Sequence, residues 1–234
     1  MNKLPEELKE HYQKNRELIK KRLNEFSVIA EEEYFYELCY CICTPQSSAK
    51  NAEKVQKKLI EMDFLSNDFN PVDLLSNREH YIRFHNQKAE RLVEAKKKYS
   101  VVLDILNLSI CPKEKREKIV GIIKGIGYKE ASHFLRNIGY RDLAIIDRHL
   151  LKNLLKCGVI ESMPKSINKA KYLEIEEKFK IYAEKVNMSI DELDLLFWSF
   201  ETGMILKSAM KYCPGGKPQS TPTIKVPPSI QLLF

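Results

Sequence analysis

The sequence predicts an all-α protein, and three observations support this prediction. Only eight glycines occur in 234 residues. Apolar residues recur at spacings of three and four through most of the chain, and the first stretch dense in proline and glycine comes after Lys207. With 44% hydrophobic and 30% charged residues, the composition is that of a folded globular chain rather than a disordered one.

The sequence predicts a succession of helices from its N-terminal part to about Thr202. Residues 4–26 form an amphipathic pattern with a break expected near Asn15, and the more apolar segment 31–43 is expected to be a buried helix that ends at Thr44-Pro45, because proline blocks its continuation. Ser189-Ile190-Asp191-Glu192 is typical of a capped helix start, which predicts a last helix to about Thr202. Apolar periodicity predicts further helices at 47–62, within 77–98, and at 114–123, 128–138, 146–156 and 171–186.

Charge and cysteine content limit the classes of function. Lys and Arg number 39 against 32 Asp and Glu, a net charge of +7 that suits a polyanionic partner such as nucleic acid. The six cysteines show neither C-x-x-C pairs nor zinc spacing, so we expect reduced thiols in a cytoplasmic protein. No apolar run reaches the roughly 20 residues that span a bilayer. The lysine run 96–98 is interpreted as a solvated helix end, with DNA contact as the alternative.

A glycine-containing hairpin is expected at Lys124-Gly125-Ile126-Gly127, between two predicted helices. Glycines at this position allow a tight turn and a close approach of a DNA phosphate, while Ile126 fills the space between the helices. Carbonyl groups of the same hairpin are candidates to hold a monovalent cation. A plain helical hairpin, in which the glycines serve only the turn, is the alternative on this motif alone.

A longer set of motifs resembles one protein family. The segments are "KGIGYKEASHFLRNIGY" followed by "AIIDRHLL", then "KYLEIEE", "ELDLLFW" and "TGMILK", and together they place the resemblance over about residues 5–207. They resemble the helix-hairpin-helix DNA glycosylase superfamily and, within it, the archaeal-type 8-oxoguanine DNA glycosylase/AP lyases. The resemblance implies two helical lobes with a cleft between them: 31–145 with the hairpin, and 1–30 plus 146–207. The prolines and glycines after Lys207 separately predict an irregular tail, 208–234.

The resemblance implies that Lys129 is the nucleophile and Asp147 the catalytic carboxylate. An amine attacks the deoxyribose only when it is neutral, and a helix N-terminus in a desolvated pocket disfavours the ammonium form. A carboxylate stabilises the positive charge that develops on the sugar, although Asp147 is also expected to cap the following helix. His149 is expected to support the turn, and His133, one turn after Lys129, is a candidate neighbour of the base pocket, with packing as the alternative.

The target base of such an enzyme must leave the duplex, and three further residues resemble those that assist this step. Gln46 in "CTPQSSA" resembles the residue that fills the vacated space, although Pro45 departs from the usual pattern. Phe84 in "RFHNQKAERL" resembles an apolar wedge. Trp198 resembles a residue near the extruded base. For Gln46 and Phe84 the alternative is loop packing, and for Trp198 it is burial in the core.

The end of the chain departs from the family pattern. Members typically end at the lysine that matches Lys207, near the base pocket, whereas 27 residues follow it here. The expected protein is a cytoplasmic, nucleoid-associated monomer that acts on double-stranded DNA containing oxidised guanine, with no cofactor beyond a candidate Na⁺ or K⁺ ion at the hairpin. The alternatives are a glycosylase of the same fold for another damaged or mispaired base, and a non-catalytic helix-hairpin-helix DNA-binding protein.

Overall fold

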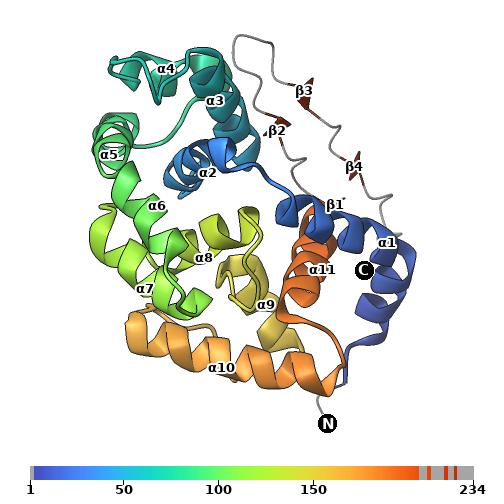
Figure 1. Ribbon diagram of the computed structural model, residues 1–234. Helices are drawn as coiled ribbons and strands as arrows, with labels where there is room; N and C mark the ends of the chain where they lie inside the picture. The colour runs from blue at the N-terminus through green and yellow to red at the C-terminus, as the bar shows by residue number, and fades with distance from the viewer. Residues whose placement is uncertain (1–2, 206–209, 212–218, 221–223, 226–234) are drawn as a thin grey trace. The chain divides into compact units, whose positions relative to one another are not determined.

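The protein is helical, as the sequence predicts (Figure 1). A computed structural model describes residues 3–205, 210–211, 219–220 and 224–225. The α-helices in these residues are α1 (Glu6–Ser27), α2 (Glu31–Cys43), α3 (Ala49–Glu61), α4 (Val72–Ser76), α5 (His85–Lys97), α6 (Tyr99–Asn107), α7 (Pro112–Ile122), α8 (Tyr128–Asn137), α9 (Arg148–Lys156), α10 (Lys169–Lys185) and α11 (Ile190–Thr202), with a short 3-10 helix η1 (Arg78–His80). This confirms the predicted fold class.

Two short pairs of strands accompany the helices. β1 (Met204–Ile205) pairs with β4 (Ile224–Lys225), and β2 (Met210–Lys211) pairs with β3 (Gln219–Ser220); both pairs are antiparallel. Three of these strands fall within 208–234, which the sequence predicts to be irregular. The apolar periodicity on which the helices were predicted has no counterpart for strands of two residues, so they left no signal in the sequence.

The chain divides into two compact units with boundaries after Ser27 and Ile138. The first unit contains α1, α9, α10, α11 and the β1–β4 pair, and the second contains α2 to α8, η1 and the β2–β3 pair. The lobes proposed from the sequence, 31–145 and 1–30 plus 146–207, stay a prediction.

Two helical features differ from the sequence prediction. α1 runs without the expected break, because the side-chain amide of the buried Asn15 donates to the carbonyl of His11 (2.8 Å) and is satisfied inside the helix. The segment after the lysine run, which was not assigned to a helix, forms α6, and only Lys98 separates α6 from α5.

The lysine run 96–98 only partly fits its interpretation as a solvated helix end. Lys97 is exposed, but the Lys96 side chain is 16% exposed, pairs with Asp68 (2.7 Å) and lies over the ring of Phe64. Lys98 binds Glu94 (2.8 Å) and donates to the carbonyl of Ile122 at the end of α7 (3.0 Å). Two of the three ammonium groups therefore hold loops and helix ends in place.

Candidate active site

The predicted hairpin joins α7 to α8 in the second unit. Ile126 is 5% exposed, and its amide donates to the carbonyl of Ile123 (3.3 Å). Gly125 has φ +87°, and a Cβ atom built there would lie 2.3 Å from Cδ of Arg91. Any side chain at residue 125 would be both strained and in collision with Arg91. The hairpin is therefore built around a bare backbone, with a guanidinium-bearing side chain against it.

The first turn of α8 carries Lys129, and the rest of the helix is held firmly in the second unit. Ala131, Phe134, Leu135 and Ile138 are buried at the spacing of one helical face. Ser132 accepts a hydrogen bond from Arg116 of α7 (3.0 Å), and Asn137 donates to the buried Glu37 of α2 (2.9 Å). These contacts fix the direction in which the start of α8 points.

The amine of Lys129 lies beside a carboxylate. Its Nζ is 3.6 Å from Oε1 of Glu130, and its side chain is 34% exposed. The other carboxylate oxygen of Glu130 accepts from the amide of Gly127 (3.3 Å), which ties this side chain to the hairpin. The side chain of Lys129 is therefore more exposed to solvent than the desolvated pocket that the sequence predicts.

Asp147, in the first unit, follows a buried extended segment. Leu143, Ala144, Ile145 and Ile146 have little solvent exposure, so their backbone polar groups need partners inside the protein. Glu176 accepts from the amide of Ala144 (3.0 Å), and the hydroxyl of Tyr172 donates to the carbonyl of Ala144 (2.6 Å). Both side chains belong to α10 and to the motif "KYLEIEE", so that motif holds the segment that leads to Asp147.

Asp147 is the N-cap of α9. Its Oδ1 accepts from the amide of Leu150 (2.8 Å), and its side chain is partly exposed. His149 is partly exposed, and its carbonyl accepts from the side-chain amide of Asn153 (2.9 Å). The capping role expected from the sequence is thus observed, whereas Lys129 belongs to the other unit and the pairing of the two residues stays a prediction.

Gln46 lies at the tip of the turn between α2 and α3. It is exposed and has φ +54°, a left-handed conformation that residues with side chains rarely adopt. The amide of Ser47 donates to the carbonyl of Thr44 (3.0 Å), and the hydroxyl of Thr44 donates to the carbonyl of Cys41 (3.0 Å). The turn therefore presents the glutamine to solvent on a defined backbone.

Phe84 is presented in a similar way at the start of α5. It is 48% exposed with φ +61°, and the guanidinium of Arg83 lies over its ring. Tyr81, 46% exposed, and His85 stand beside it and line the same open hollow. An exposed aromatic side chain on a strained backbone contradicts the alternative that Phe84 is an ordinary packed loop residue.

Two of the three residues predicted for the base pocket, His133 and Trp198, lie in the described part of the chain. His133 is partly exposed, and its ring makes an edge contact with Tyr40 (5.7 Å between centroids). Trp198, on α11, is partly exposed, and its place near the extruded base stays a prediction. Lys207 lies outside the described residues. His133 belongs to the second unit and Trp198 to the first.

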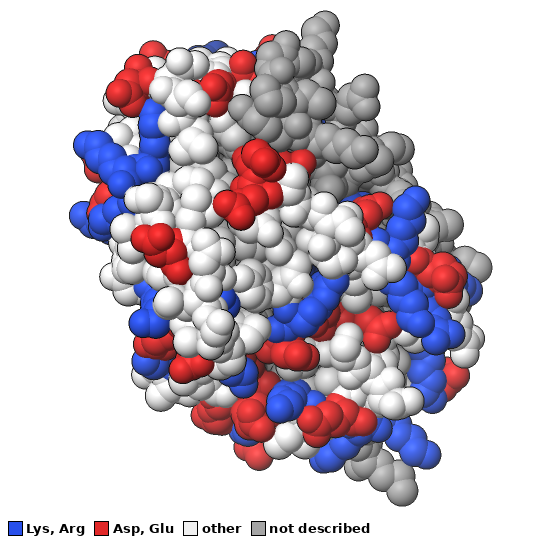
Figure 2. Space-filling model, in the orientation of Figure 1, with Lys and Arg blue, Asp and Glu red and all other residues white. Residues whose placement is uncertain are grey.

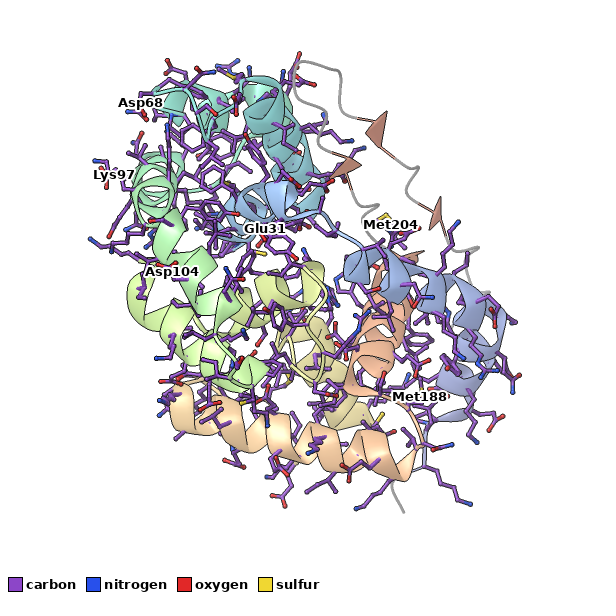
Figure 3. The ribbon with its side chains drawn as sticks, viewed as in Figure 1. Glu31, Asp68, Lys97, Asp104, Met188 and Met204 are labelled. Carbon is purple, nitrogen blue, oxygen red and sulfur yellow. The ribbon has the colours of Figure 1, made fainter. Side chains whose placement is uncertain are left out.

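Charge is mixed on one face of the molecule. On the face shown in Figure 2, acidic and basic side chains are interspersed. An open hollow of about 1080 Å³ in the second unit has Asp68 and Lys97 in its lining, both labelled in Figure 3, but it contains no predicted site residue.

Thiol and metal chemistry leave few candidates in the described chain. Cys39, Cys41, Cys43, Cys111 and Cys157 form no disulfide bond, and Cys213 lies outside the described residues. Burial raises the pKa of the Cys39 thiol well above its usual value, which makes it a poor nucleophile. Among the residues that the structure covers, no cluster of His, Cys, Asp and Glu is arranged to hold a metal, and no helix is long and apolar enough to cross a bilayer.

Sequence reasoning missed several residues that organise the site. Lys88 and Ser47 join the turn of Gln46 to the loop of Phe84, Arg91 lies against the hairpin, and Tyr172 and Glu176 support the segment before Asp147. Each was visible only as one polar residue in an amphipathic helix or a loop. Their roles depend on contacts with residues 28 to 41 positions away in the chain, or on a close approach to the backbone, and the spacing of residues along the sequence does not reveal either.

Comparison with known proteins identifies relatives across most of the chain. A family model described as 8-oxoguanine DNA glycosylase matches residues 19–188. An 8-oxoguanine DNA glycosylase/AP lyase of Methanocaldococcus jannaschii is 41% identical over 196 residues, 82% of this chain and 93% of the relative. One of Fusobacterium nucleatum is 41% identical over 211 residues, 86% of this chain and 96% of the relative.

Solved structures agree with these matches. The crystal structure of the M. jannaschii 8-oxoguanine DNA glycosylase has a TM-score of 0.76 at 38% identity and covers 86% of this chain and 94% of its own. Another structure of that glycosylase/lyase, in complex with a 15mer DNA containing 8-oxoguanine, has a TM-score of 0.76 at 36% identity and covers 86% of this chain and 99% of its own. The Thermotoga maritima 8-oxoguanine DNA glycosylase has a TM-score of 0.75 at 34% identity, with coverage of 86% and 97%.

Proposed function

Because this chain belongs to the 8-oxoguanine DNA glycosylase family, we propose that it excises 8-oxoguanine from duplex DNA and then cleaves the strand at the same site. The observation that carries the proposal is the hairpin Gly125–Gly127 followed at once by Lys129 in the first turn of α8. A bare backbone suits the approach of a phosphate, and an amine beside it reaches the sugar that this phosphate carries.

The proposed reaction starts with the Nζ lone pair of Lys129, which forms a bond to C1′ of the damaged nucleotide. The C1′–N9 bond breaks and the base leaves with that electron pair and a proton. Opening of the C1′–O4′ bond then gives an imine between Nζ and C1′. Loss of a proton from C2′ and cleavage of the C3′–O3′ bond nick the strand by β-elimination, and water hydrolyses the imine to free the enzyme.

Attack requires that Lys129 first loses its proton. In the free protein, the side chain of Lys129 is 34% exposed and its Nζ lies 3.6 Å from Oε1 of Glu130. Bound DNA excludes water, and Glu130 is a carboxylate within reach to accept the proton. The activation expected of a buried lysine is therefore assigned to the complex with DNA rather than to the free enzyme.

Asp147 supplies the carboxylate of the proposed reaction. Departure of the base builds positive charge on the sugar, and a fixed negative charge beside it lowers the energy of that state. The N-cap bond to Leu150 and the supports from Tyr172 and Glu176 hold the carboxylate in one orientation before substrate arrives. Such preorganisation avoids a reorganisation step during the reaction.

Extrusion of the base is assigned to Gln46 and Phe84. Gln46 fills the vacated space and Phe84 separates the neighbouring bases, roles that suit two exposed side chains on defined backbones. Trp198, Lys207 and His133 are assigned to the pocket of the extruded base. The enzyme is proposed to act as a cytoplasmic monomer on duplex DNA.

A monovalent cation on the hairpin carbonyls is part of the same proposal, with no further cofactor. One carbonyl at this end of α7 is already engaged, since Lys98 donates to Ile122. A Na⁺ or K⁺ ion would add positive charge at the phosphate site through the remaining carbonyls.

The experiment that tests the function is incubation of the protein with duplexes that each contain one lesion: 8-oxoguanine, an oxidised pyrimidine, or adenine opposite 8-oxoguanine. Release of the base and nicking of the strand are measured separately. The proposal predicts both products from the 8-oxoguanine duplex. Activity confined to another lesion would contradict the substrate assignment, and salt-dependent binding without either product would favour a DNA-binding module.

A further inference from the structure

Two exposed turns of the second unit share an unusual backbone. Gln46 and Phe84 both have positive φ, at +54° and +61°, although neither is glycine. A left-handed backbone at a residue with a side chain is disfavoured, so it persists only where surrounding contacts hold it. The contacts that hold these two turns come from the same place.

A buried ammonium group supports the turn of Gln46. The side chain of Lys88, on α5, is 2% exposed and points its Nζ at three oxygens of the α2–α3 turn. The amine donates to the carbonyls of Cys43 (2.8 Å) and Pro45 (2.6 Å) and to the hydroxyl oxygen of Ser47 (3.2 Å). All three donor positions of an ammonium are used, and the acceptors lie on both sides of Gln46.

The same hydroxyl connects the turn to the loop of Phe84. Ser47 Oγ accepts from the amide of Arg83 (3.0 Å), the residue before Phe84. The backbone amide of Lys88 in turn donates to the carbonyl of Phe84 (3.0 Å). Lys88 and Ser47 therefore form a closed set of bonds that includes the neighbours of both exposed residues.

We propose that Lys88 is a positioning residue that fixes the turn of Gln46 and, through Ser47, the loop of Phe84, so that the two side chains enter DNA as one rigid unit. The proposal rests on the function proposed above for these two residues. It explains why an ammonium is buried here at all, since burial and the charges of Arg91 and Lys129 oppose its charge. Burial lowers the pKa of Lys88 to about 8, and the carboxylate of Glu130 acts in the opposite direction.

The test compares Lys88→Met with the wild type on two duplexes, under single-turnover conditions. One contains 8-oxoguanine, whose base must be extruded, and the other contains a preformed abasic site, which has no base to extrude. If Lys88 acts through Gln46 and Phe84, the rate of base excision falls by about tenfold, while the rate of strand cleavage at the abasic site changes by less than about twofold. A 2-aminopurine next to the lesion reports unstacking, and its fluorescence change should slow by the same factor as excision.

Lys115→Met is the matched control. Lys115 is 5% exposed, and its ammonium donates to the carbonyls of Ile105, Leu106 and Leu108, far in sequence from both turns. It has the same chemistry as Lys88 but holds the end of α6. We expect this variant to be less stable than the wild type, with no selective loss of rate on the 8-oxoguanine duplex relative to the abasic duplex.

A double-mutant comparison distinguishes positioning from general destabilisation. In a Gln46→Ala, Phe84→Ala background, Lys88→Met should lose most of its effect on excision, because the side chains through which it acts are gone. The proposal would be overturned if Lys88→Met slowed excision equally in both backgrounds. It would also be overturned if Lys88→Met slowed the reactions on both duplexes equally and Lys115→Met did the same. If Lys88→Met does not fold, Ser47→Ala removes the shared oxygen without removing a buried charge and is predicted to show the same pattern.

The outcomes separate this inference from the proposed function. A wild-type protein that neither releases 8-oxoguanine nor cleaves the abasic duplex would contradict the function. An active wild type with an unaffected Lys88→Met variant would contradict the inference alone.

Discussion

Two lysines of the second unit, Lys129 and Lys88, differ in what surrounds their amines. Lys129 is 34% exposed and has one carboxylate at 3.6 Å, whereas Lys88 is 2% exposed and donates to three oxygens. The pKa of Lys88 is lowered to about 8, and a lowered pKa is often taken to mark a nucleophilic lysine. Yet its amine has no direction left in which to attack.

The difference shows that a lowered pKa identifies a reactive amine only when the lone pair is accessible. All hydrogens of Lys88 are committed to one turn, so its low pKa records the energetic cost of burial rather than readiness to react. Lys129 lacks those commitments and follows the hairpin directly. We therefore assign the covalent chemistry to Lys129 and a positioning role to Lys88.

The largest effect is expected from Lys129→Gln, which replaces the amine with an amide that cannot form an imine. Excision of 8-oxoguanine and strand cleavage should both fall by at least about a thousandfold in single-turnover assays. DNA binding should change little, because the hairpin is intact. A variant that keeps even a tenth of wild-type cleavage would place the nucleophile elsewhere, with Lys88 the next lysine to examine.

Asp147→Asn removes the negative charge and keeps an oxygen for the N-cap. The excision rate should fall by about a hundredfold, because charge that develops on the sugar is no longer balanced. The melting temperature of Asp147→Asn should shift only slightly. Asp147→Ala also loses the cap, so its free energy of unfolding should be about 1 kcal/mol lower than that of Asp147→Asn. Equal activity of Asp147→Asn and wild type would restrict Asp147 to a capping role.

Lys88→Met and Lys115→Met should resemble each other in stability and differ in activity. Each removes a buried donor and leaves carbonyls unpaired, so chemical denaturation should show a loss of about 1–3 kcal/mol in both variants. Only Lys88→Met should slow excision selectively. If Lys115→Met also slowed excision more than cleavage at an abasic site, the effect of Lys88→Met could not be attributed to the turns of Gln46 and Phe84.

The smallest effect concerns the dependence of stability on pH. The folded pKa of Lys88, about 8, lies below its ordinary value of 10.5, so the unfolded chain binds more protons between these values and stability rises with pH. The difference in free energy of unfolding between the wild type and Lys88→Met should rise by about 1 kcal/mol in favour of the wild type between pH 7 and pH 9. Charged or titratable neighbours Cys43, Arg91, Glu130 and Lys129 are present in both proteins. A flat difference would mean that Lys88 titrates normally.

Much of the fold was predictable because it is written in local patterns. The bounds of α2 and the cap of α11 at Ser189 follow from apolar runs and a capping sequence, and the hairpin follows from two glycines around an isoleucine. Asp147 as a cap was predictable for the same reason. The boundary between α5 and α6 was not, because a run of lysines masks a helix end whose ammonium groups bind distant partners.

The supports of the site were beyond sequence reasoning. The bonds from Lys88 to the Gln46 turn join residues 41 to 45 positions apart, and Tyr172 reaches a backbone carbonyl 28 positions away. Neither the left-handed backbone of Gln46 nor that of Phe84 is signalled by glycine or asparagine. Such features come from tertiary contacts that force a local conformation against its own preference.

The central claim is that one particular amine forms the covalent link to DNA, and the most direct measurement locates that link. The protein is incubated with an 8-oxoguanine duplex and borohydride, which reduces the imine to a stable amine, and the adduct is digested and mapped by mass spectrometry. We expect the sugar fragment on Lys129. An adduct on Lys88 or on any other lysine, or no adduct while strand cleavage proceeds, would contradict it.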